Sequence, residues 1–460
     1  MLFSSATFLF YFFPAFLLLY YALPGKNTVL LLASLLFYAW GEPRFVLLLL
    51  ASSLLDYGTG QLLTRAADKR KLILTLGIGA NLALLVYFKY LGFFCSSLNQ
   101  LLNALGGPGK LPVPEVVLPL GISFFTLQGI SYLLDVSRGT VNAQSSFWRF
   151  FMYKAMFPQL IAGPIVRYQQ IANDIDQRSL PNERIWRGVR QFILGLAQKI
   201  LIANTVAQGA DPLFAVPPDQ LSTIAAWLGI ACYTLQILYD FAGYSNMAIG
   251  IGQMIGFDYP PNFNRPYTAL SITDFWRRWH ISLLSWFRDY LYIPLGGNRV
   301  SNARTYFNLA LVFVLCGLWH GAAWTFLLWG AWHGLLLILE RGGLARLLAR
   351  LPATLAQAWT MLCVMLGWVL FRANDLPQAL HYLQTLFGIA PTVAQPHPWQ
   401  MDIHAAQWLA LFVGSTLALW RKPPQITQPL WQALLSALGL LLSASSLAAG
   451  TYNPFIYFHF

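Results

Sequence analysis

Charged residues are scarce in this chain, and their scarcity excludes most soluble folds. Only 10% of its 460 residues are Asp, Glu, Lys or Arg, whereas 57% are hydrophobic. Ordinary soluble domains carry about 25% charged residues. Cysteine is rare as well, and none of its four cysteines belongs to a C-x-x-C pair. Neither a disulfide framework nor a zinc site is therefore supported.

The N-terminus also lacks the features of a cleaved signal peptide. No basic residue precedes Phe8, and Tyr20-Tyr21 stand where small residues would precede a cleavage site. We interpret this first apolar run as a retained membrane span.

Long apolar runs without Asp, Glu or Arg dominate the rest of the chain. They cover residues 8–23, 72–94, 116–134, 224–239, 306–339, 358–371, 405–419 and 430–449. A bilayer span needs about 20 mostly apolar residues, and some of these runs are shorter. We predict an all-α polytopic membrane protein with about ten to twelve membrane helices, including re-entrant and interfacial segments. It is expected to form a single membrane-embedded domain over residues 1–460.

Basic residues form three groups that orient the chain. The groups are Arg65, Lys69, Arg70 and Lys71; Arg167, Arg178, Arg184, Arg187 and Arg190; and Arg265, Arg277, Arg278, Arg288, Arg299 and Arg304. Cytoplasmic loops are enriched in Lys and Arg, so we place these groups in the cytoplasm and the loop containing Asp211 and Asp219 outside. This distribution accounts for the net charge of +12 without a nucleic-acid partner.

Strict alternation of sides fails around residues 148–168, because both flanks of this segment look cytoplasmic. A re-entrant segment would resolve the conflict, and Pro158, Gly163 and Pro164 are suitable helix breakers.

His320 is the most informative single residue, because it lies deep inside the apolar run 306–339. As one helix this run would be about 50 Å long, whereas the hydrocarbon core is about 30 Å thick. The run must therefore bend, tilt strongly or form a hairpin, and Gly317 and Gly321 offer places to do so. An ionisable residue at this depth usually marks a functional path. The alternative is a core histidine held by a backbone carbonyl.

Two neighbours of His320 in the sequence need separate interpretations. Cys316 shares a helix face with His320, which permits a Cys–His nucleophile pair, although a buried cysteine is more often a small hydrophobe. His333 would lie about 20 Å away on a continuous helix, so we interpret it as a packing residue and expect no metal site.

The segment Thr273–Leu291 has the pattern of an amphipathic helix in the membrane interface, with Thr273 as its N-cap. Arg277, Arg278 and Arg288 lie on its polar arc, and His280 lies at the edge of the apolar arc. The arginines could bind lipid headgroups, with His280 as packing. The functional interpretation is that they hold an anionic acyl donor.

Several of these segments together resemble one family. They are 157–165 (FPQLIAGPI), 262–267 (NFNRPY), 274–283 (DFWRRWHISL), 286–299 (WFRDYLYIPLGGNR), the His320 segment and 453–458 (NPFIYF). With them the chain resembles the membrane-bound O-acyltransferases, in the branch of the alginate O-acetylation membrane protein.

The resemblance implies two functional histidines, which map onto His280 and His320, with His320 as the catalytic base. It implies acetyl-CoA as the donor substrate, with no permanently bound cofactor, and an exported polysaccharide as the final acceptor. An extracytoplasmic acetyltransferase or relay protein is the expected partner, and the bacterial inner membrane the expected location. We keep two alternatives: D-alanyl transfer to teichoic acids, and a transporter in which His320 and His280 relay protons.

Overall fold

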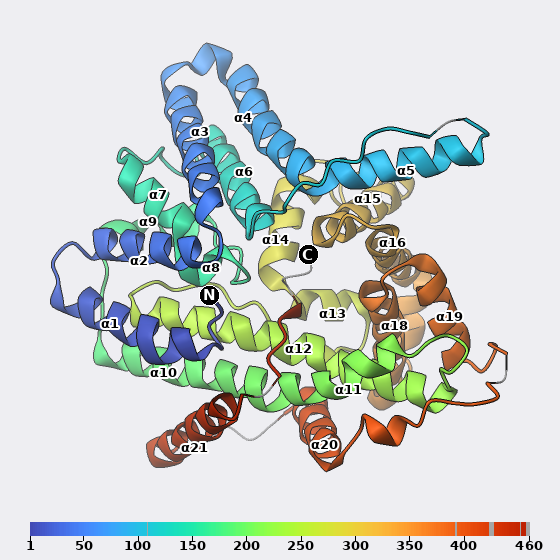
Figure 1. Ribbon diagram of the computed structural model, residues 1–460. Coiled ribbons are helices and arrows are strands. Elements are labelled where there is room, and N and C mark those ends of the chain that lie inside the picture. Colours follow the sequence, from blue (N-terminus) through green and yellow to red (C-terminus); the bar gives the residue numbers. More distant parts are fainter. Residues whose placement is uncertain (108, 392, 423–426, 451, 457–460) are drawn as a thin grey trace. The chain divides into compact units, whose positions relative to one another are not determined.

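The computed structural model describes residues 1–107, 109–391, 393–422, 427–450 and 452–456 (Figure 1). Residues 457 and 458, which close the last of the family-like segments, lie outside the described residues. The chain divides into two compact units, which are described separately. Unit 1 comprises Met1–Gly188 and Ile251–Pro260, and unit 2 comprises Val189–Gly250 and Pro261–Phe460. One domain over residues 1–460 stays a prediction.

The described residues are helical or irregular, without a β-strand. Most helices of unit 1 precede residue 180: η1 (Phe8–Phe12), α1 (Phe13–Ala22), α2 (Lys26–Gly41), η2 (Pro43–Phe45), α3 (Val46–Arg65), η3 (Ala67–Lys69), α4 (Arg70–Leu85), η4 (Val86–Tyr90), α5 (Leu91–Ala104), α6 (Ile122–Arg138), α7 (Phe147–Ala155), α8 (Phe157–Leu160) and α9 (Tyr168–Asp176). Two helices, α10 (Asn182–Ala197) and α12 (Thr223–Met254), cross a unit boundary.

The remaining helices belong to unit 2. They are η5 (Gln198–Ala203), α11 (Asn204–Ala215), η6 (Pro266–Thr268), α13 (Ile272–Arg278), α14 (Ile281–Phe287), η7 (Arg288–Tyr292), α15 (Asn302–His320), α16 (Trp324–Leu339), η8 (Glu340–Leu344), α17 (Ala345–Leu348), α18 (Ala353–Arg372), α19 (Leu376–Leu386), η9 (Trp399–Met401), α20 (Ala405–Leu419) and α21 (Pro429–Ala448).

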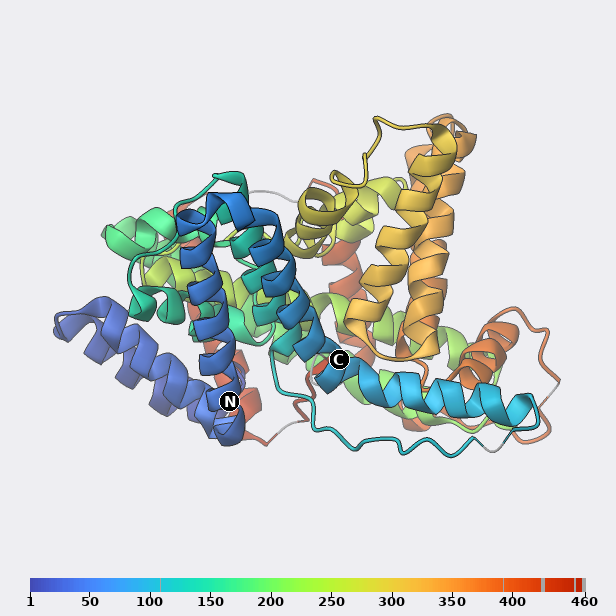
Figure 2. The ribbon, with the colours of Figure 1, turned by 90° about the horizontal axis from the view of Figure 1, so that it is seen from above.

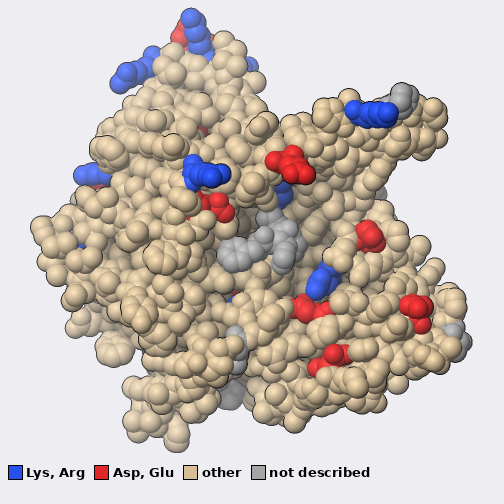
Figure 3. All heavy atoms as spheres, in the orientation of Figure 1, with Lys and Arg blue, Asp and Glu red and all other residues tan. Residues whose placement is uncertain are grey.

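Five helical stretches of the described chain are long and apolar enough to cross a bilayer. They are Pro43–Arg65, Ala67–Ala104, Thr223–Met254, Ala353–Arg372 and Pro429–Ala448. Phe8–Ala22 and Ala405–Leu419 are shorter apolar helices. The all-α architecture is confirmed, and the count of ten to twelve membrane helices stays a prediction. Figure 3 shows a mostly uncharged face, with Lys and Arg gathered at the turn between α3 and α4.

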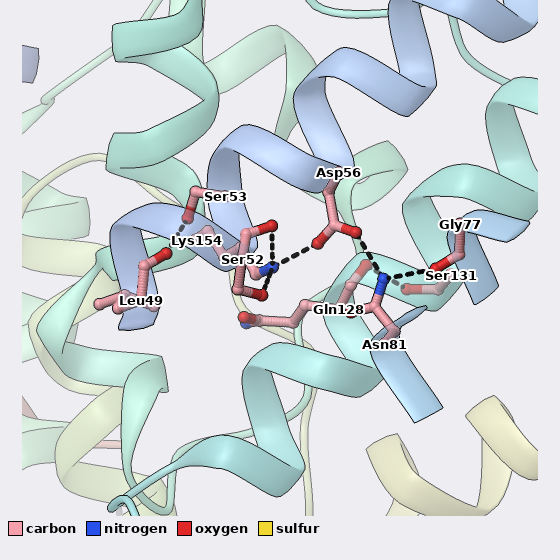
Figure 4. Close-up of polar contacts among 9 residues, drawn as sticks. All are labelled: Leu49, Ser52, Ser53, Asp56, Gly77, Asn81, Gln128, Ser131 and Lys154. Atoms are coloured by element: carbon pink, nitrogen blue, oxygen red, sulfur yellow. Dashed lines mark hydrogen bonds and ion pairs between the residues drawn. The ribbon is translucent and has the colours of Figure 1, made fainter. Parts of the chain in front are cut away.

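A buried polar network joins α3, α4 and α7 in unit 1 (Figure 4). Lys154 and Asp56 form an ion pair in which both side chains are fully buried. The Lys154 ammonium also donates to Ser52 Oγ at 2.7 Å, and Asn81 donates to the second oxygen of Asp56 at 2.6 Å. A Cβ on Gly129 of α6 would overlap the Asp56 carboxylate, so glycine permits this close packing.

The segment predicted to re-enter the membrane has an interrupted backbone. Helix α7 ends at Ala155, α8 is a single turn, and residues 161–167 are irregular. Every residue from 150 to 168 is buried. Buried, irregular backbone is what a re-entrant segment requires, and its re-entry into the membrane stays a prediction.

In unit 2, the apolar run 306–339 forms a helical hairpin. Helices α15 and α16 lie side by side and are joined by residues 321–323 (Figure 2). Gly317 and Gly330 bring the two backbones together, since a Cβ on either would overlap a carbonyl of the other helix. The hairpin is one of the three outcomes that the length of the run predicted, and it leaves His320 as the last residue of α15.

The prediction of one continuous helix over Thr273–Leu291 is wrong. Helix α13 ends at Arg278, α14 begins at Ile281, and His280 between them has a left-handed backbone with φ 45°. The preceding segment takes the hydrogen bonds that a helix would use. Ile281 N donates to Asn262 O at 3.0 Å, and Asn264 N donates to Arg278 O at 2.9 Å. The N-cap is Ser271 rather than Thr273, since Ser271 Oγ accepts from Asp274 N.

Candidate active site

The break between α13 and α14 is held from two sides. Residues 262–264 bond to its backbone, as described above. At the start of α13, the buried carboxylate of Glu340 accepts hydrogen bonds from Thr273 N at 2.9 Å and from Thr273 Oγ at 2.6 Å. A carboxylate at a helix N-terminus stabilises the free N–H groups there. The left-handed turn at His280 is therefore fixed by contacts rather than by local sequence preference.

The hydrogen bonds around His280 define the tautomer of its ring. Asn262 Oδ1 accepts from Ser282 N at 3.2 Å and from Ser282 Oγ at 2.8 Å. A backbone N–H can only donate, so this atom of Asn262 is the oxygen. It lies 3.1 Å from His280 Nδ1, which must then carry the proton. In the neutral ring Nε2 keeps the lone pair, and within the described chain this buried nitrogen has no hydrogen-bond partner.

The hairpin turn brings His320 to the same place. The ring centroids of His280 and His320 are 6.2 Å apart. His320 is 3% exposed and is surrounded by the rings of Trp319, Trp329 and Phe371, at 5.0, 5.1 and 5.2 Å. The two histidines predicted from the sequence are thus neighbours inside an aromatic enclosure, although forty residues separate them in the chain.

A basic pocket lies beside α13 and α14, and neither histidine belongs to its lining. Arg277 and Arg288 line a cavity of about 580 Å³, together with Arg341, a basic residue that the sequence analysis missed. The lining also includes Ile281, next to His280, and Trp276, whose ring lies 5.6 Å from that of Trp329. Arg278 is outside this lining, and its guanidinium pairs with Asp274 at 2.8 Å. The lining thus combines three arginines with the aromatic rings of Trp276 and Phe313, and Arg288 is paired with Asp289 at 2.7 Å.

A second, more polar pocket has a volume of about 470 Å³, and neither histidine belongs to its lining. Its lining includes Phe371, which contacts His320, and also Arg372, Gln236 and Tyr452. Arg372 pairs with Asp211 at 3.0 Å, and Tyr452 donates to the same carboxylate at 2.8 Å. Burial and this hydrogen bond raise the pKa of the Tyr452 phenol to about 12, so it remains a donor at neutral pH.

The end of the described chain forms part of the same wall. Pro454, Phe455 and Ile456 line the second pocket. A buried ion pair between Lys199 and Asp240 holds them, because Lys199 donates to Pro454 O and Asp240 accepts from Ile456 N at 2.9 Å.

The other two candidate residues, His333 and Cys316, are packed among buried side chains. Trp276 Nε1 donates to His333 Nδ1 at 3.3 Å, and the His333 ring stacks among Phe275, Trp276 and Trp329. Cys316 is buried one turn before His320 on α15. No group of three or more potential metal ligands occurs within the described part of the chain.

Sequence comparison gives this site a family. The profile of the membrane-bound O-acyltransferase family matches residues 141–368. The chain is 40% identical over 497 residues to the "Probable alginate O-acetylase AlgI" of Pseudomonas putida, with 100% of both proteins covered. This chain belongs to the membrane-bound O-acyltransferase family. It is therefore a multi-pass membrane enzyme, an O-acyltransferase, as the sequence resemblance implied.

Two further relatives extend the comparison. The "Probable alginate O-acetylase AlgI" of Pseudomonas aeruginosa is 42% identical over 425 residues, covering 90% of this chain and 79% of that protein. The "Peptidoglycan O-acetyltransferase" of Helicobacter pylori is 38% identical over 428 residues, covering 85% and 80%. The part of the chain that matches the family profile contains both histidines, Asn262 and every residue that lines the basic pocket.

Proposed function

We propose that this acyltransferase moves acetyl groups from cytoplasmic acetyl-CoA across the bacterial inner membrane, for O-acetylation of an exported polysaccharide such as alginate. His320 acts as the general base. The observation that carries the proposal is the pairing of His280 with His320 at 6.2 Å, beside two pockets whose linings include Ile281, which follows His280, and Phe371, which contacts His320. The names of the relatives support acetyl as the group transferred and a glycan as the final acceptor.

The basic pocket suits the donor. Coenzyme A carries phosphates, and guanidinium groups bind phosphate strongly through paired N–H donors. Arg277 and Arg288 supply these groups, and Arg341 adds a third, held at 3.1 Å by Asn298 Oδ1. The charge pattern of the sequence assigns this side to the cytoplasm, where acetyl-CoA is made.

The second pocket suits the acceptor. Its Asp211 lies in α11 rather than in a loop, and the same charge pattern predicts that the stretch from Asp211 to Asp219 lies outside. Its lining offers hydrogen-bond donors and acceptors beside aromatic rings, which is a suitable surface for a hydroxyl-bearing molecule. Gln236 is 3% exposed, and its Oε1 has no hydrogen-bond partner within the described chain, so it can accept a bond from such a hydroxyl.

The transfer needs one base and no redox step. The acceptor hydroxyl gives its proton to the neutral His320 imidazole while its oxygen attacks the thioester carbonyl. A C–O bond forms, the C–S bond breaks, and the departing thiolate takes the proton back from His320. The products are an acetyl ester and free coenzyme A. The Nε2 lone pair of His280 serves as the second proton-accepting group, and Trp319 and Trp329 help to exclude water.

The test compares His320→Ala with His333→Gln in membranes that contain equal amounts of protein. Radiolabelled acetyl-CoA is supplied on the cytoplasmic side, and label in the exported polymer is measured in the presence of the extracytoplasmic partner. General-base catalysis typically contributes about 10²–10⁴-fold, so we expect His320→Ala to lose that much activity. His333→Gln should retain most activity, because its ring is interpreted as packing.

Two results would overturn the proposal. The first is full acetyl content of the polymer with His320→Ala. The second is label transferred from carrier-bound D-alanine and none from acetyl-CoA, which would favour the teichoic-acid alternative. Movement of a substrate across the membrane without consumption of a thioester would favour the transporter alternative, although the family to which the chain belongs consists of acyltransferases.

A further inference from the structure

A third cavity lies along α20, apart from the two pockets of the active site. It is a groove of about 750 Å³ within unit 2. One side is formed by successive turns of α20, through Ala406, Ala410, Val413 and Leu417. The other sides are formed by residues of α10, η5, α12 and α21. The groove therefore follows the whole length of α20.

The lining of this groove is mainly apolar and opens to the surroundings. Leu194, Leu409, Leu417 and Leu442 all contribute to it, and between 48% and 64% of each side chain is exposed. Such an apolar surface in a membrane protein is suited to acyl chains. Helix α20 has 15 residues, about 22 Å at 1.5 Å per residue, so it is shorter than the hydrocarbon core of about 30 Å.

Cationic side chains gather where α20 ends. Arg265 lines the groove, and its guanidinium donates to Arg421 O at 3.2 Å, two residues past the C-terminus of α20. Lys422 follows and is exposed. None of these three residues has an acidic partner among the ion pairs of the described chain. The Arg421 guanidinium donates to Gln357 Oε1 and to Ala353 O, so Arg265 is the cation that lines the groove. An apolar groove with this cation at one end matches a lipid with acyl chains and an anionic headgroup.

The same groove touches the loop that holds His280. Phe263, Arg265 and Pro266 line it, directly after Asn262. The Phe263 ring lies 4.9 Å from Phe241 and 5.0 Å from Trp279, and Phe241 lies 4.7 Å from the His280 ring. Arg265 also has a left-handed backbone, with φ 47°. A ligand in the groove would therefore contact the outer surface of the segment whose inner surface orients His280.

We propose that the groove is a binding site for one anionic phospholipid, which stabilises residues 262–266 and thereby supports acyl transfer. The acyl chains lie along α20, and the headgroup phosphate contacts Arg265, with the exposed Lys422 as a further cation at this end of α20. The binding part stands by itself, whereas the effect on turnover rests on the proposed acetyltransferase function.

Binding is tested with the full chain in nanodiscs of phosphatidylcholine, titrated with phosphatidylglycerol and read by native mass spectrometry. Arg265→Gln should weaken phosphatidylglycerol binding about fivefold, since a basic residue near a membrane surface contributes about 1 kcal/mol. Val413→Trp, which fills the groove without changing charge, should also lower occupancy. Arg304→Gln is the matched control, because Arg304 is exposed on the same predicted side but lies outside the groove.

The activity arm measures acetyl transfer with and without phosphatidylglycerol. We expect several-fold stimulation of the wild type and little stimulation of Arg265→Gln or Val413→Trp, with unchanged melting temperatures as a check on folding. Equal binding of both lipids, or equal binding by all variants, would overturn the site. A protein chain that occupies the groove and excludes lipid would do the same. If the wild type binds lipid but transfers no acetyl group, the proposed function fails and the binding site stands.

Discussion

Two clusters of ionisable residues are buried in this protein, one in each unit, and they differ in whether their polar atoms already have hydrogen-bond partners. In unit 1, Lys154 and Asp56 are fully buried, but each is engaged: the ammonium by Asp56 and Ser52, and the second carboxylate oxygen by Asn81 (Figure 4). In unit 2, His280 and His320 face each other within an aromatic enclosure, and His280 retains a lone pair on Nε2.

The difference separates structural from chemical roles for ionisable groups inside a membrane protein. A charge whose hydrogen bonds are all used within the protein fixes the packing of helices. An imidazole with an available lone pair can accept a proton from a substrate. Depth of burial alone does not distinguish the two.

The largest expected effect comes from breaking the unit 1 pair. Lys154→Met leaves Asp56 buried without its partner, which typically costs about 3–5 kcal/mol of stability. Arg149→Gln is the control, because the Arg149–Asp176 pair is about half exposed and such pairs contribute only about 0–1 kcal/mol. Melting temperatures in detergent provide the measurement. A stable but inactive Lys154→Met protein would show that this cluster has a role in catalysis, and it would contradict the distinction drawn between the two clusters.

A smaller effect is expected from loosening the unit 2 pair. Asn262→Leu removes the acceptor that fixes the His280 tautomer, and a lost buried hydrogen bond is worth about 1–3 kcal/mol. We expect acetyl transfer to fall by about tenfold to a hundredfold. Asn264→Leu is the matched control, because the contact of Asn264 with the break is made by its backbone. Equal activity of the two variants would show that the tautomer of His280 has no part in the reaction.

The smallest effect should come from the rim of the basic pocket. Arg277→Gln and Arg288→Gln should each raise the KM for acetyl-CoA about fivefold with little change in kcat, which corresponds to about 1 kcal/mol of donor binding. The sequence predicts the same for Arg278, whereas its place outside the pocket lining predicts less than about a twofold change. Steady-state kinetics of the three variants will separate the two predictions.

Composition and charge placement predicted an all-α membrane protein, and the family resemblance implied an enzyme with His280 and His320 at its site. Composition is an average over long segments, so it predicts membrane helices without knowledge of the detailed packing. The structure places the two rings 6.2 Å apart, and their roles stay a prediction. The length of the run 306–339 predicted a bend, a strong tilt or a hairpin, and the structure has the hairpin, with His320 at a helix end. Arg277, Arg278 and Arg288 were all candidates for donor binding, and Arg277 and Arg288 line one cavity whereas Arg278 does not.

The break at His280 could not be predicted from periodicity, because the arcs of residues 273–291 fit an unbroken helix. It depends on backbone hydrogen bonds from residues 262–264, which are not encoded in the spacing of apolar residues. Asn262, Glu340 and Arg341 were missed for the same reason: each acts on residues far from it in the chain. The motif NFNRPY, which contains Asn262, was the available signal, but it was used only as a mark of resemblance.

The left-handed turn at position 280 determines how this enzyme should be dissected. Left-handed backbone suits glycine, and other residues there carry a cost of about 1–2 kcal/mol. A glycine would relax the turn and delete the imidazole, while most other replacements would keep the strain and change the contacts. Every substitution of His280 therefore changes both the backbone strain and the imidazole. A substitution of Asn262, whose side-chain amide binds the ring, changes the orientation of the imidazole without altering the turn residue itself.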